Sequence, residues 1–102
     1  MIARLWWGWT TSDNADAYQE LLRTEILPEI QTIAGCQGVY VLRRDVEDGV
    51  EFVVFSQWQS LDAVRRFADE EPDVAVVPPE ARALLSRFDE TVKHYETVLQ
   101  PD

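Results

Sequence analysis

The sequence has few of the residues that reactive or exported proteins rely on: it contains one cysteine, one histidine and no long apolar run. The single cysteine, Cys36, excludes a disulfide within the chain, which fits a reducing compartment. The aromatic run near the start is too short for the core of a signal peptide, and no stretch approaches the ~20 apolar residues that span a bilayer. We therefore expect a cytoplasmic protein without a membrane anchor.

Basic residues are scarce too, since nine Lys and Arg stand against 19 Asp and Glu and give a net charge of -10. Such a field repels phosphate backbones and anionic lipid surfaces, so we expect neither nucleic acid nor a membrane as a partner. The acidic runs at residues 47–48 and 69–73 lack the ligand spacing of a cation-binding loop. They indicate solvated surface, and we expect no metal site.

What the sequence does contain is aromatic bulk, with four Trp, four Phe and three Tyr among 102 residues. This length suits a single domain, residues 1–102, with one modest core. Residues 2–10 read as a strand with apolar side chains on both faces. Trp6 and Arg4 share one of these faces, and Trp7 lies on the other, because side chains alternate along a strand.

Helical spacing of apolar residues follows over residues 15–34, with Ser12 or Asp13 as the expected cap. Pro28 predicts a kink or break just before it, and Gly35 is placed to end the helix. The later elements are expected at the following residues: strands at 39–45 and 50–58, a helix at 61–69 capped by Ser60, a short helix at 81–85 begun by Pro79, and a last strand at 88–99.

This order, β-α-β-β-α-β, predicts an α+β protein with a ferredoxin-like antiparallel sheet. Two helices can cover only one face of such a sheet. The third strand nevertheless carries Phe52 and Val54 on one face and Val53 and Phe55 on the other. An apolar second face in so short a chain requires a cover, so we expect a homodimer that packs sheet on sheet.

Four segments, IARLWWGWT, GCQGVYVLRR, EFVVFSQWQSLDAVRRFA and SRFDETVKHYE, together resemble the antibiotic biosynthesis monooxygenase (ABM) domain over nearly the whole chain. The resemblance implies a dimeric α+β barrel with a pocket between each sheet and its helices. Some members of the family oxidise aromatic polyketide precursors with O₂ and no cofactor, and others bind and degrade haem. Trp58 matches the Trp that lines the pocket in both groups. Val54 and Val64 replace the Asn and Tyr of the cofactor-free oxygenases, and residues 69–77 lack the iron-binding His of the haem degraders.

His94 is the expected catalytic residue, because a neutral imidazole can take up a proton near neutral pH. It could also ligate haem iron, or simply be a hydrogen-bonded strand residue. Arg4, a cation in an apolar strand, is predicted either to hold an anionic ligand or to pair with Glu90 or Glu96.

Trp58 stands at the carboxyl end of a central strand, where pockets are common, and its indole N–H offers one polar handle. With Trp6, Trp7 and Phe67 it would form the wall against a small aromatic ligand. We therefore expect an ABM-like monooxygenase that acts on such a ligand with O₂ and without a cofactor. A haem-binding or haem-degrading protein and a non-catalytic ligand-binding module are the alternatives.

Overall fold

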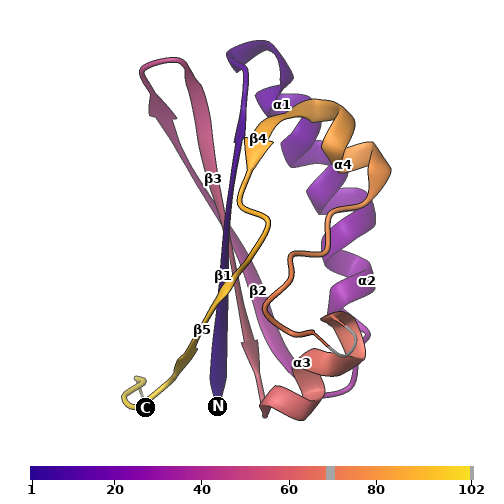
Figure 1. Ribbon diagram of the computed structural model, residues 1–102, viewed down its shortest axis with the longest axis vertical. Helices are drawn as coiled ribbons and strands as arrows, with labels where there is room; N and C mark the ends of the chain where they lie inside the picture. Colours follow the sequence, from indigo (N-terminus) through magenta and orange to yellow (C-terminus); the bar gives the residue numbers. More distant parts are fainter. Residues whose placement is uncertain (69–70, 102) are drawn as a thin grey trace.

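The helices and the strands form two layers, and all helices described lie on the same side of the sheet (Figure 1). The computed structural model describes residues 1–68 and 71–101. The elements are β1 (Ile2–Thr10), α1 (Ser12–Leu21), a π-helical segment η1 (Leu22–Ile26), α2 (Leu27–Gln31), β2 (Cys36–Val46), β3 (Gly49–Trp58), α3 (Leu61–Ala68), α4 (Pro79–Leu84), β4 (Leu85–Phe88) and β5 (Lys93–Glu96).

The strands form one five-stranded antiparallel sheet in the order β2-β3-β1-β4, and β5 also pairs with β1. The predicted α+β class and ferredoxin-like order are therefore confirmed. The expected single last strand is instead two short ones. β4 pairs with the end of β1 from Gly8, whereas β5 pairs with its beginning, up to Leu5.

Trp6 contacts the chain at this interruption. Its indole Nε1 donates a hydrogen bond to the carbonyl oxygen of Asp89 at 2.8 Å, and the Asp89 N–H donates to the Trp7 carbonyl at 3.0 Å. The next residues also bond away from β1, since the Glu90 carbonyl accepts from the Ala75 N–H and the Val92 N–H donates to the Asp73 carbonyl. The strand therefore breaks after Phe88 and resumes at Lys93.

The first helix differs from the prediction at its start and in its middle. Thr11, rather than Ser12 or Asp13, is the N-cap, and its hydroxyl accepts from the Asn14 N–H at 3.3 Å. Ahead of Pro28 the helix widens into η1 instead of breaking, and the Leu27 N–H bonds five residues back to the Leu22 carbonyl. A π turn of this kind absorbs the hydrogen bond that proline cannot make.

The hairpin and the second helix follow the prediction closely. β2 and β3 are joined at a turn of Glu47 and Asp48, and Ser60 caps α3 by accepting from the Ala63 N–H at 3.2 Å. The residue at which this helix was expected to end, Asp69, lies outside the described residues. Gly35 has a φ of 95° in the turn before β2, a conformation that favours glycine.

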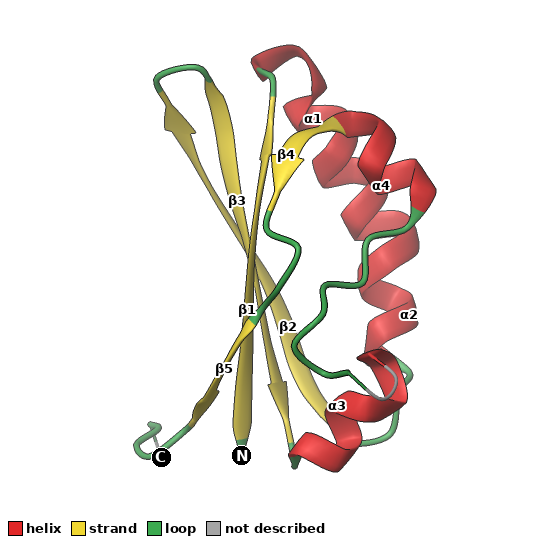
Figure 2. Ribbon diagram, in the orientation of Figure 1, coloured by secondary structure: helices red, strands yellow, loops and turns green. Residues whose placement is uncertain are grey.

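The connection between α3 and α4 runs over the helix side of the sheet as an extended segment (Figure 2). We call residues 71–78 the strap. Its Ala75 N–H donates to the Glu90 carbonyl at 2.9 Å, and the Val92 N–H donates to the Asp73 carbonyl at 2.8 Å. The strap is thus fastened to the chain between β4 and β5, which brings it close to the beginning of β1.

Apolar side chains on the helix side gather in two clusters, one around Phe52 and Tyr18 and the other around Trp58 and Val64. The opposite face of the sheet is not covered by the described chain, and Tyr40, Leu42 and Tyr95 are each more than half exposed there. None of the described helices is long and apolar enough to cross a bilayer.

Candidate functional site

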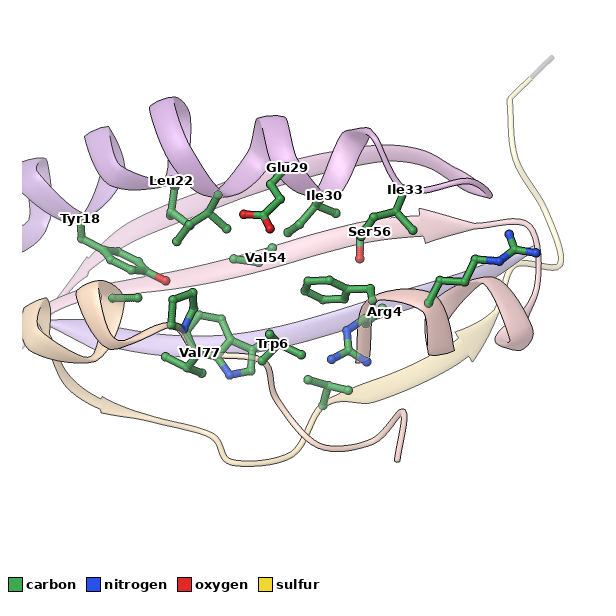
Figure 3. A pocket seen from close by; sticks show the side chains of 17 residues that line it. Arg4, Trp6, Tyr18, Leu22, Glu29, Ile30, Ile33, Val54, Ser56 and Val77 are labelled. Carbon is green, nitrogen blue, oxygen red and sulfur yellow. The ribbon is translucent and has the colours of Figure 1, made fainter. Parts of the chain in front are cut away.

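A cavity of about 280 Å³ lies between the sheet and the helices, where the two core clusters meet (Figure 3). Its volume is at the small end of the roughly 300–1,000 Å³ typical of ligand pockets. Most of the lining is apolar and comes from β1, β3, the helices and the strap: Trp6, Leu22, Ile26, Ile30, Ile33, Val54, Phe67, Val76, Val77, Pro78, Ala81 and Val92. The polar lining residues are Arg4, Tyr18, Glu29, Ser56 and Arg66.

Arg4 supplies a buried positive charge, since only 4% of the residue is exposed. Its Nη1 donates to the Pro72 carbonyl and contacts His94 Nε2 at 3.1 Å, and its Nη2 donates to the Val74 carbonyl at 3.2 Å. The predicted pairing with Glu90 or Glu96 is therefore wrong, because β5 places His94 opposite Arg4 and the strap offers carbonyl oxygens instead. Burial lowers the pKa of the guanidinium to about 10, which leaves it charged at neutral pH.

His94 connects Arg4 with an exposed carboxylate. Its Nδ1 lies 2.9 Å from Asp73 Oδ1, and because a carboxylate only accepts, Nδ1 carries the proton. Nε2 of the neutral ring is then the acceptor for the Arg4 N–H. Burial is the main cause that lowers the pKa of His94, and the charge of Arg4 acts in the same direction. The imidazole is therefore neutral near pH 7, with both nitrogens engaged.

Ser56 lies opposite Arg4 in the register of β1 and β3 and is 4% exposed. Its Oγ accepts a hydrogen bond from the indole Nε1 of Trp58 at 2.9 Å. A hydroxyl that accepts in this way still has its own proton to donate. Trp58 therefore orients a donor that stands beside the guanidinium.

Tyr18 comes from α1, is 1% exposed and packs edge-on against Phe52 with ring centroids 4.8 Å apart. Its hydroxyl points into the cavity (Figure 3), and within residues 1–68 and 71–101 it has no hydrogen-bond partner. Burial raises the pKa of this phenol, so the hydroxyl stays protonated and can act as a donor.

Glu29 is the acidic member of the described lining, and it enters from α2. Figure 3 shows its carboxylate turned from the helix toward the sheet, between Tyr18 and Arg4. Arg66 lies at the edge, and its Nη1 donates to the Ala34 carbonyl at 2.9 Å. The site thus combines a buried cation, two hydroxyl donors and one carboxylate on an otherwise apolar wall.

Three of the predicted site residues, Arg4, Trp6 and Phe67, line this cavity. Trp58 does not. It is fully buried behind Phe67, and the two rings stack with centroids 5.9 Å apart. The cavity therefore does not lie directly beside Trp58, contrary to expectation. Phe67 and Ser56 contact Trp58 on one side and line the cavity on the other.

The other two predicted residues also lie outside the lining. Trp7 belongs to the outer face of the sheet, where the Lys93 ammonium stands 5.6 Å from the centre of its ring. His94 touches the site only through Arg4.

Tyr18, Glu29 and Ser56 were not among the predicted site residues. The apolar helical stripe that contains Tyr18 was a usable signal, since a polar tip within such a stripe needs a partner or a ligand. Glu29 had no such signal, because it is an exposed helix carboxylate like many others in this sequence. The acidic runs form no metal site among residues 1–68 and 71–101, since no group of three or more potential ligands gathers there.

Known proteins with this arrangement support a family assignment. The family described as antibiotic biosynthesis monooxygenase matches residues 8–72. No curated protein is significantly similar in sequence. An antibiotic biosynthesis monooxygenase of known structure is 20% identical and superposes with a TM-score of 0.70 over 97% of this chain and all of its own.

Two further structures resemble the chain in fold. The haem degrader MhuD of Mycobacterium tuberculosis, solved with two haems in its active site, is 16% identical with a TM-score of 0.62 over 100% of both chains. The monooxygenase ActVA-Orf6 of Streptomyces coelicolor, solved with nanaomycin D, is 16% identical with a TM-score of 0.56 over 99% of this chain and 91% of its own. At these identities the structures show a common fold. The family match covers more than half of this chain. Together with the common fold, it shows that this chain belongs to the antibiotic biosynthesis monooxygenase family.

Proposed function

We propose that this protein is a cofactor-independent monooxygenase that oxidises a small aromatic, polyketide-like substrate with O₂. The observation that carries the proposal is the cavity itself, in which a buried guanidinium and a carboxylate stand on an apolar wall. Aromatic side chains of Trp6 and Phe67 give the wall flat surfaces against which a ring can pack. The relatives named above include monooxygenases, which fits this reading.

Glu29 is the group best placed to remove a proton from a bound substrate, because it is the carboxylate of the described lining. Loss of a proton from an activated ring CH₂ of a phenol or ketone leaves an enolate. Its oxygen would be stabilised by the buried donors of the lining, the Arg4 guanidinium at one end or the Tyr18 hydroxyl at the other.

The carbanionic carbon of this enolate then bonds to O₂ and, with the proton returned from Glu29, becomes a hydroperoxide. Loss of water from the hydroperoxide converts the original CH₂ into C=O, so that substrate and O₂ give ketone and H₂O. All electrons come from the substrate, and no further reductant is needed. The apolar surroundings would keep bulk water away from the enolate and the hydroperoxide.

His94 was the predicted base, and in this proposal it is a positioning residue instead. Both of its nitrogens are engaged, with Arg4 on one side and Asp73 on the other, and it does not reach the cavity. A His94→Gln variant should therefore retain proton removal but hold Arg4 less firmly. We expect KM to rise more than kcat falls.

Haem does not fit the residues of this site. The predicted iron ligand, His94, has both nitrogens engaged and lies outside the lining. Tyr18 is the one common haem-ligand type among the described lining residues, and burial keeps its phenol protonated. A cavity of about 280 Å³ is also too small to enclose a porphyrin.

Oxygen uptake tests the proposed activity. Wild-type protein with an anthrone should consume O₂ and release the corresponding quinone, and Glu29→Gln should lower the rate about a hundredfold or more. Glu25→Gln is the matched control, since Glu25, like Glu29, is exposed on the helical stretch 22–31, but it lies outside the lining. No uptake above buffer would refute the oxygenase. Thermal stabilisation by the anthrone without uptake would identify a ligand-binding module instead.

The uncovered sheet face supports assembly as a homodimer, packed sheet on sheet. Tyr40 and Leu42 stand more than half exposed there, and proteins that remain monomeric rarely leave a large apolar patch in water. Light scattering should give twice the 11.8 kDa chain mass, and Leu42→Glu should shift it toward one chain. An 11.8 kDa wild-type species at micromolar concentration would contradict the dimer. Because the sequence has a single cysteine and therefore no internal disulfide, we propose that the protein is cytoplasmic.

A further inference from the structure

The end of the cavity at Arg4 has hydrogen-bond donors that find no acceptor in the described part of the chain. An arginine side chain has five N–H donors, and the contacts with Pro72, Val74 and His94 use three of them. The Ser56 hydroxyl stands opposite Arg4 in the strand register and retains its proton for a further partner. Arg4 and Ser56 both line the cavity, in which the free acceptor of the described lining is the Glu29 carboxylate on the helix side.

Within residues 1–68 and 71–101, no carboxylate balances the charge of Arg4 by direct contact. Its partners in the described chain are two carbonyl oxygens and a neutral imidazole, and no described carboxylate forms an ion pair with it. Asp73 is the nearest acidic partner, and it acts through His94 with a side chain that is 78% exposed. A buried cation without an adjacent anion is costly, and an anionic ligand would remove that cost.

The opposite end of the cavity offers a third donor of a different kind. The Tyr18 hydroxyl, on a side chain that is 1% exposed, points into the space and has no partner in the described chain (Figure 3). Trp6 and Val54 separate this end from Arg4 and provide an apolar passage between the two.

We propose that the cavity selects an aromatic monoanion whose acidic group binds Arg4 and Ser56 and whose far end accepts a hydrogen bond from Tyr18. Arg4 favours this orientation, because the opposite one would place the acidic group at the Tyr18 end, away from the guanidinium. This inference rests on the proposed function for the cavity as the substrate site, and it adds the charge and orientation of the substrate.

Three matched probes distinguish the contact at Arg4 and Ser56 from the contact at Tyr18. They are 2-naphthoate, its neutral amide 2-naphthamide, and 6-hydroxy-2-naphthoate, which adds an oxygen at the far end. Calorimetric titration of the wild-type protein should show the acid binding about ten- to a hundredfold more tightly than the amide, as expected for hydrogen bonds to a charged group. The hydroxy acid should gain about three- to tenfold over the acid.

The variant Tyr18→Phe should lose the gain from the ligand hydroxyl and keep the preference for acid over amide. Tyr40→Phe, on the outer face, should behave like wild type. Equal binding of acid and amide, or no binding of any probe, would overturn the anion site. An undiminished hydroxyl gain in Tyr18→Phe would overturn the assignment of Tyr18.

These outcomes are distinct from those of the oxygen-uptake assay. Selective binding of the acid without turnover of any aromatic substrate would refute the oxygenase and leave the anion site standing. Oxygen uptake with a neutral anthrone, together with equal binding of acid and amide, would refute the anion site and leave the oxygenase standing.

Discussion

Tyr18→Phe should leave the free protein as stable as wild type or make it slightly more stable. The Tyr18 ring is 1% exposed and packs edge-on against Phe52, and phenylalanine preserves that contact. The hydroxyl has no partner within the described chain, and a hydroxyl left at a cavity wall without a hydrogen bond costs up to roughly 1–3 kcal/mol. Water in the cavity can recover part of that cost. We therefore expect a gain in the free energy of unfolding of zero to about 1 kcal/mol.

Urea unfolding followed by tryptophan fluorescence measures this change, at one protein concentration so that assembly does not alter the comparison. A gain of 1 kcal/mol would raise Tm by about 4–8 °C in a domain of this size. Tyr18→Ala should instead lose about 3–5 kcal/mol, because it removes the ring. Tyr40→Phe, at an exposed position, should change stability by no more than about 0.5 kcal/mol. A loss above about 1 kcal/mol in Tyr18→Phe would show that the hydroxyl stabilises the fold, and the reasoning would fail.

Gly8→Ala should destabilise the protein by about 1–3 kcal/mol and weaken 2-naphthoate binding. A Cβ at Gly8 would lie 2.5 Å from the Trp6 ring and would push that ring into the cavity. Unchanged stability and affinity in this variant would contradict the prediction. Protonation of His94 should destabilise the protein, because burial and Arg4 lower its folded-state pKa below the 6.5 of the unfolded chain. The stability that the neutral His94 contributes is complete above pH 6.5 and is lost as the pH falls through the folded-state pKa. The variant His94→Gln should therefore flatten the pH dependence of the free energy of unfolding. Parallel pH profiles for the two proteins between about pH 5 and 7 would refute this assignment.

The strands and their order were predictable because each rests on a local pattern. Residues 2–10 and 50–58 carry β-forming side chains on two faces, and the short turn between β2 and β3 fixes their register. The cap of α3 at Ser60 followed from its position before an apolar helical pattern.

The break in the last strand could not be found in this way. It goes with the contact between Trp6 and Asp89 and with the bonds of Glu90 and Val92 to the strap, which join positions far apart in the sequence. The alternation of residues 88–99 contains no sign of that contact. The π-helical widening before Pro28 was foreseen only as a disturbance, since both a break and a π turn satisfy the missing N–H.

The candidate site was predictable on its strand side and not on its helix side. Arg4 and Trp6 share a face of β1 by simple alternation, and both line the cavity. Trp58 also points to the helix side, but Phe67 comes between it and the cavity, which depends on how α3 packs. Pairing of Arg4 with the strap depends on a long connection whose path no local pattern specifies.

The most direct measurement for the central claim uses the four tryptophan indole signals in a ¹H–¹⁵N NMR spectrum, recorded while 2-naphthoate is added. Trp6 lies on the cavity wall, whereas Trp7 and Trp9 belong to the outer face of the sheet. If the cavity beside Arg4 is the ligand site, the Trp6 signal shifts in proportion to occupancy and those of Trp7 and Trp9 do not. Shifts of Trp7 or Trp9 with an unmoved Trp6 would place the ligand on the other face and contradict the account.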